Sequence, residues 1–79
     1  MDINKKLNKL FIEIFNKKIE SDKDKKMLFN KFENYDSILH MKLFLYVERE
    51  FNISISEKDI FSSNNYQKLY KVIKLNIEN

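Results

Sequence analysis

The chain has 79 residues, which is the size of a single domain with one core, and 43% of them are hydrophobic, which excludes an intrinsically disordered chain. The absence of cysteine excludes disulfides, thiolate metal sites and thiol nucleophiles, and the absence of glycine excludes glycine-rich phosphate-binding loops. The formal net charge is +3, and the excess of lysine lies in residues 1–31, whereas residues 32–79 are close to neutral.

A first helix is predicted from Ile3 to about Lys17–Ile19, with Asp2 or Asn4 as its N-cap. Its apolar residues recur at spacings of three and four, which places them on one face of a helix. These residues are Ile3, Leu7, Leu10, Phe11, Ile14 and Phe15. We expect this face to pack in the core.

Residues 20–26 are polar and are predicted to form a loop. The apolar residues after it, Met27-Leu28-Phe29 and Phe32, are expected to anchor the loop on the core and to include a short helical turn. The whole connection from Ser21 to Tyr35 is long for so small a domain, and such connections are more often functional or packed than slack.

A second helix is predicted from Ser37 to about Phe51, with Asp36 as its N-cap. It is apolar over more than half of its circumference. One stripe consists of Leu39, Leu43, Val47 and Phe51, and we expect Leu43, Val47 and Phe51 in the core. The other stripe is then available for a different contact, and it contains Ile38, Met41, Leu45 and Glu48.

The rest of the chain predicts an extended connector, a short helix and a last helix. Residues 52–55 alternate polar and apolar, and we expect Ile53 and Ile55 to be buried, because a lone strand has no partner to pair with. Residues 56–60 resemble a capped helical turn, and Asn64 or Asn65 is expected to cap a final helix whose apolar positions are Tyr66, Leu69, Tyr70, Val72 and Ile73. The predicted fold is therefore an all-α single domain over residues 1–79, a small bundle of three main helices and one short helix with a long first loop.

Catalytic side chains are scarce. His40 is the only histidine, and it lies three residues after Ser37, on the same side of the second helix. A serine and a histidine at this spacing form a nucleophile and a base only where a third group and an oxyanion site support them, and the sequence offers neither. We therefore predict that the chain is not an enzyme and that His40 faces solvent or a partner.

Three consecutive features carry a family resemblance. Asp36-Ser37-Ile38 opens the second helix, Val47-Glu48-Arg49-Glu50-Phe51 closes it, and Asn52-Ile53-Ser54-Ile55 follows. Together they resemble the acyl carrier protein family, including its peptidyl and D-alanyl carrier relatives, over roughly residues 32–75. The N-terminal helix agrees with that family in place and pattern but carries no specific motif.

The resemblance implies a 4'-phosphopantetheine arm, derived from coenzyme A and attached covalently to Ser37, with Asp36 in a supporting role. A phosphodiester at this position would lie at the positive end of a helix dipole. The implied partners are a phosphopantetheinyl transferase, an enzyme that loads an acyl or aminoacyl group as a thioester, and the downstream enzymes of a dedicated biosynthetic pathway. The carrier is expected to be a cytoplasmic monomer.

By the same resemblance, Ile38, Met41 and Leu45 face partner enzymes, although ordinary core packing is the alternative for each of them. Lys42 and Arg49 are also assigned to this contact surface, and they depart from the acidic second helix of many carriers. The glycine that usually precedes the Asp-Ser pair is replaced by Asn34-Tyr35. These departures favour partners with a complementary surface of their own.

Two alternatives remain open from the sequence. One is a basic helical module that binds nucleic acid or a membrane surface, although the lysines alternate with acids and arginine is almost absent. The other is a protein-interaction domain that is never modified. No apolar run is long enough to span a membrane, so membrane insertion is not expected, and nucleic acid is not an expected partner.

Overall fold

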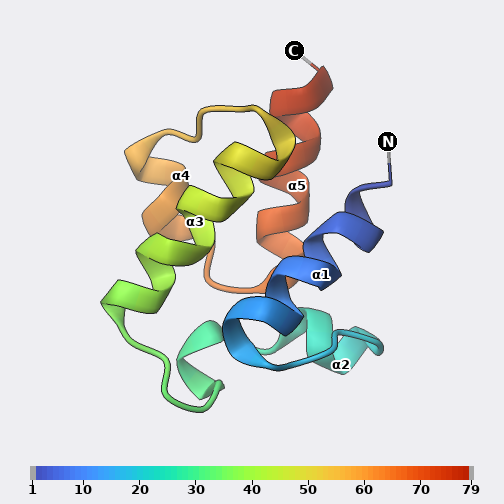
Figure 1. Cartoon of the computed structure of the whole chain (residues 1–79), viewed down its shortest axis with the longest axis vertical. Coiled ribbons are helices and arrows are strands. Elements are labelled where there is room, and N and C mark those ends of the chain that lie inside the picture. Colours follow the sequence, from blue (N-terminus) through green and yellow to red (C-terminus); the bar gives the residue numbers. More distant parts are fainter. Residues whose placement is uncertain (1, 79) are drawn as a thin grey trace.

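The computed structural model describes residues 2–78 and contains five α-helices and one 3₁₀ turn (Figure 1). The elements are α1 (Ile3–Phe15), α2 (Asp22–Lys26), the 3₁₀ turn η1 (Phe29–Lys31), α3 (Ser37–Phe51), α4 (Glu57–Ser62) and α5 (Tyr66–Glu78). The prediction of an all-α fold is confirmed, since no strand occurs in residues 2–78. None of the helices in this part of the chain combines the length and the apolar character needed to cross a membrane.

The core forms where α1 packs against α3 and α5. Phe11 lies at its centre, fully buried, with its ring centroid 5.2 Å from that of Tyr66 and 5.6 Å from that of Phe29. The Tyr66 hydroxyl donates a hydrogen bond of 2.8 Å to the side-chain oxygen of Asn4, so α5 is fixed to the first turn of α1. The remaining buried apolar residues are Leu7, Leu10, Ile19, Phe32, Leu43, Phe44, Val47, Phe51, Ile55, Leu69 and Ile73.

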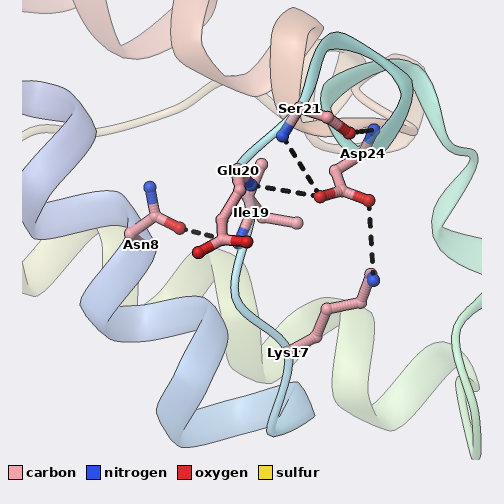
Figure 2. A network of polar contacts seen from close by, with 6 residues as sticks. All are labelled: Asn8, Lys17, Ile19, Glu20, Ser21 and Asp24. Atoms are coloured by element: carbon pink, nitrogen blue, oxygen red, sulfur yellow. Dashed lines mark hydrogen bonds and ion pairs between the residues drawn. The ribbon is translucent and has the colours of Figure 1, made fainter.

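The predicted loop over residues 20–26 is wrong, because α2 forms there and packs against α5. Figure 2 shows the contacts that start this helix. The Ser21 hydroxyl oxygen accepts a hydrogen bond from the Asp24 N–H at 3.1 Å, and the Asp24 carboxylate accepts from the N–H groups of Glu20 and Ser21 at 3.1 and 3.2 Å. This is a capping box, whose sequence signal is a serine followed three residues later by an acid.

The Asp24 carboxylate makes this helix start sensitive to acid. Its hydrogen bonds from the backbone N–H groups of Glu20 and Ser21 lower the pKa of Asp24 below 3.8, and the charge of Lys17 adds to the effect. A depressed pKa in the folded state stabilises the fold above the unfolded value, and the stabilisation is lost as the pH falls below about 4 and through the folded pKa. The stability difference between the unchanged chain and Asp24→Asn should therefore shrink in this acid range, as measured by urea unfolding at a series of pH values. Asp22→Asn removes the same charge without touching the capping box, and an equal effect from it would contradict the assignment.

Three asparagines replace the glycines that the chain lacks. Asn16, Asn34 and Asn52 have positive φ angles of 53°, 60° and 53°, in the left-handed region that asparagine tolerates better than most residues. Asn16 ends α1 at Phe15, because its N–H bonds back to the Ile12 carbonyl at 2.9 Å, so the predicted extension to Lys17–Ile19 is wrong. The Ile19 N–H instead donates to the Asn8 side-chain oxygen at 2.9 Å, which seats Ile19 in the core (Figure 2).

The predicted start of α1, both ends of α3 and the start of α5 are confirmed, whereas α4 runs to Ser62, two residues beyond the predicted helical turn. Asp2 caps α1 by accepting from the Lys5 N–H at 3.0 Å, and Asn65 caps α5 by accepting from the Lys68 N–H at 2.8 Å. In the predicted connector Ile55 is buried, but Ile53 is only half-buried.

Candidate functional site

Ser37 is the first residue of α3, and its side chain is exposed. Asp36 is the N-cap, as predicted, and its carboxylate accepts from the Leu39 N–H at 2.8 Å. Among residues 2–78 no acceptor pairs with the N–H groups of Ser37 and Ile38. The hydroxyl of Ser37 therefore lies next to free donors at the positive end of a helix, where a negatively charged group is favoured.

The segment that leads to Ser37 is fixed at several points. Phe32 is buried, Asn34 takes the left-handed backbone conformation, and Tyr35 is half-buried. Asn34 therefore takes a backbone conformation that glycine adopts most easily, in a chain that has no glycine.

His40 is buried, so the prediction that it faces solvent or a partner is wrong. It continues the inward face of α3, because Leu43, Phe44 and Val47 follow it at spacings of three, four and seven residues. Its ring lies 4.9 Å from that of Phe44, centroid to centroid. This spacing was readable in the sequence, but the polarity of histidine favoured a surface position.

Both ring nitrogens of His40 have partners. Nε2 lies 2.7 Å from the carbonyl oxygen of Ile60 in α4, and Nδ1 bonds the hydroxyl of Tyr35. A carbonyl only accepts, so Nε2 carries a proton, and in the neutral ring Nδ1 accepts from Tyr35. Burial raises the pKa of Tyr35, and the nearby charge of Asp36 adds to this, which keeps the proton on the phenol.

This arrangement, which we call the His40 bridge (Tyr35, His40 and Ile60), connects three parts of the chain. Tyr35 belongs to the segment before Ser37, His40 to the first turns of α3, and Ile60 to α4. Since α4 has no fully buried side chain, the bond to its Ile60 carbonyl contributes directly to its attachment. The bridge therefore sets how α4 and the Ser37 segment lie relative to each other.

A groove with a volume of about 610 Å³ opens beside Ser37. Its walls combine the exposed apolar side chains of Leu28, Met41 and Phe61 with the two side chains of the His40 bridge. Grooves of this size and character suit small apolar groups. Ser37 itself is one of the residues that line this groove.

The predicted contact residues of α3 all lie outside the core. Ile38 is 75% exposed, Met41 49% and Leu45 52%, so core packing is not their role. Lys42 and Arg49 are also exposed. The stripe predicted for the core is confirmed at Leu43, Val47 and Phe51, whereas Leu39 is half-buried.

The described residues do not assemble a metal centre or a serine–histidine pair. In residues 2–78 no three histidine, cysteine or acidic side chains are grouped as metal ligands would be. The nitrogens of His40 bond Tyr35 and Ile60, not Ser37.

Ser37 thus combines an exposed hydroxyl, free backbone donors and an apolar groove at one helix start. A function for the chain is inferred from these residues, because no protein-family model and no curated protein sequence matches it.

Proposed function

We propose that the chain is a carrier protein that holds an acyl, aminoacyl or peptidyl group on a phosphopantetheine arm attached to Ser37. The observation that carries the proposal is the exposed Ser37 hydroxyl at the N-terminus of α3, beside the apolar groove. A bound arm would supply a terminal thiol, which the cysteine-free chain lacks, and this thiol would hold the cargo as a thioester.

The residues around Ser37 fit a phosphodiester. The N–H groups of Ser37 and Ile38 are the donors for its oxygens, and the α3 dipole favours its negative charge. Asp36 orders the first turn through its bond to the Leu39 N–H and so fixes where these donors point.

The chain would act as a substrate of other enzymes and would itself catalyse nothing. A phosphopantetheinyl transferase installs the arm from coenzyme A, a loading enzyme adds the cargo, and the enzymes of a dedicated cytoplasmic pathway use it. Tethering raises the effective concentration of the cargo at each active site. The groove beside Ser37 supports a cargo with an apolar part.

Intact-mass measurement tests the proposal. The purified chain is incubated with coenzyme A and a broad-specificity phosphopantetheinyl transferase, and we expect a mass gain of one phosphopantetheine. Ser37→Ala should show no gain, whereas Ser62→Ala, which removes another exposed serine hydroxyl, should behave like the unchanged chain. No gain on the unchanged chain, or an equal gain on Ser37→Ala, would refute it.

A further inference from the structure

A hollow of about 390 Å³ lies between α2 and α5, two helices that pack against each other (Figure 1). From α5 it is bordered by Gln67, Tyr70, Lys71 and Lys74, which share one face of the helix because they fall at positions i, i+3, i+4 and i+7. From α2 it is bordered by Lys25. We call this hollow the α2–α5 pocket, and it shares no lining residue with the groove at the start of α3.

Three lysines, Lys25, Lys71 and Lys74, border the α2–α5 pocket. Among residues 2–78 none of the three forms an ion pair. Lys71 and Lys74 are neighbours on the surface of α5, and like charges at such a spacing are slightly unfavourable. An anion held between the three ammonium groups would relieve this repulsion, so the pocket is a place where a negatively charged ligand is favoured.

The acids near the pocket limit the extent of this positive charge. Asp22 is the single acid among the lining residues of the pocket. The carboxylate of Asp24, in the same helix, is occupied by the capping box. On the other side of Lys74, Asp2 and Glu78 border a separate hollow of about 640 Å³. The positive charge is therefore concentrated at the α2–α5 pocket and does not continue along α5.

Neutral hydrogen-bond donors lie beside these lysines. The Asn4 side-chain oxygen accepts from the Tyr66 hydroxyl, which leaves the amide nitrogen of Asn4 as a donor at the pocket. Burial raises the pKa of Tyr66 to about 12, so this phenol keeps its proton and adds no negative charge. Among residues 2–78 the Tyr70 hydroxyl and the Gln67 amide have no hydrogen-bond partner. Cations together with neutral donors suit the oxygens of a phosphate group.

We propose that the α2–α5 pocket binds a small molecule that carries a phosphate group on a polyol, such as a sugar phosphate. The lysines and neutral donors hold the phosphate, and Asp22 accepts from a hydroxyl of the polyol. The pocket volume is that of a small-ligand site. An extended nucleic acid is a poorer occupant, because Asp22, Asp2 and Glu78 would face its further phosphates. The proposal does not depend on the proposed arm at Ser37.

Amide NMR titrations of the isotope-labelled chain test the class of ligand. The probe is glucose 6-phosphate, and its matched controls are glucuronate, which carries a carboxylate at the same carbon, and glucose, which carries no charge. Glucose 6-phosphate should shift the signals of α2 and of residues 66–74 and saturate in the millimolar range. Glucuronate and inorganic phosphate should each bind about tenfold more weakly, and glucose should cause no shift. Equal binding of glucuronate would refute the preference for phosphate, and equal binding of inorganic phosphate would refute the contact with the polyol.

Two pairs of lysine substitutions separate the pocket from the overall charge of the chain. Lys25→Gln with Lys71→Gln should weaken the binding of glucose 6-phosphate at least about tenfold. Lys23→Gln with Lys68→Gln removes the same charge from the same two helices, at exposed lysines outside the pocket, and should weaken it less than about twofold. Equal weakening by the two pairs, or tighter binding per phosphate to single-stranded RNA or to phosphatidic acid vesicles, would overturn the proposal. Ser37→Ala should bind the probe like the unchanged chain, so the pocket and the arm at Ser37 are tested separately.

Discussion

Phe11→Ala should lower the free energy of unfolding by about 3–5 kcal/mol, because it empties the centre of the core. The Phe11 side chain is fully buried and its ring contacts four other aromatic rings, those of Phe15, Phe29, Phe32 and Tyr66. A chain of 79 residues has a total stability of roughly 4–12 kcal/mol. The substitution therefore removes a large part of what holds the domain together.

Urea unfolding followed by circular dichroism measures this effect. Phe61→Ala is the matched control, since it removes the same ring from a position that is 66% exposed and should change the stability by less than about 1 kcal/mol. If Phe11→Ala is unfolded without denaturant, Phe11→Leu gives a smaller loss that is still measurable. Similar midpoints for Phe11→Leu, Phe11→Ala and Phe61→Ala would show that Phe11 is not central to the core.

His40→Ala should cost about 2–3 kcal/mol, because it opens a cavity next to Phe44 and leaves the Ile60 carbonyl without its donor. The loss of protection against hydrogen exchange should be confined to the segments that contact His40. Amide hydrogen exchange should quicken in α4 and in residues 32–36, the two segments that the His40 bridge joins to α3.

Two variants distinguish the loss of the hydrogen bonds in the His40 bridge from a general loss of packing. Tyr35→Phe removes only the hydroxyl and should quicken exchange before Ser37 while α4 keeps its protection, at a cost of about 1 kcal/mol. Met41→Ala shortens an exposed side chain on the same helix and should leave both segments protected. Exchange in His40→Ala that quickens evenly over the whole domain would argue against a bridge.

The main helices were predictable because their apolar residues recur with the helical period. The bounds of α3 and its Asp36 cap are as predicted, and most of the core follows from the same pattern. The short helix α2 was missed because it has no buried residue, so periodicity gave no signal, and only the spacing of Ser21 and Asp24 marked it.

The surroundings of Ser37 were less predictable than its position at the start of α3. A histidine is ordinarily assigned to a surface by its polarity, and burial depends on partners that lie elsewhere in the chain. Here those partners are a phenol five residues earlier and a backbone carbonyl twenty residues later, which a local pattern does not bring together. The groove beside Ser37 likewise depends on Leu28, which lies between α2 and η1, and on Phe61 of α4, and these two residues are far apart in the sequence.

The contact between α1 and α5 has a consequence for the order of events during synthesis. Phe11 needs Tyr66 as a neighbour, and the hydrogen bond from Tyr66 to Asn4 spans 62 residues. A ribosome must therefore release the chain as far as α5 before the core closes, although α3 packs on α1, which is synthesised before it. If the proposed arm at Ser37 needs the closed core for its attachment, it would be added only after α5 has been synthesised.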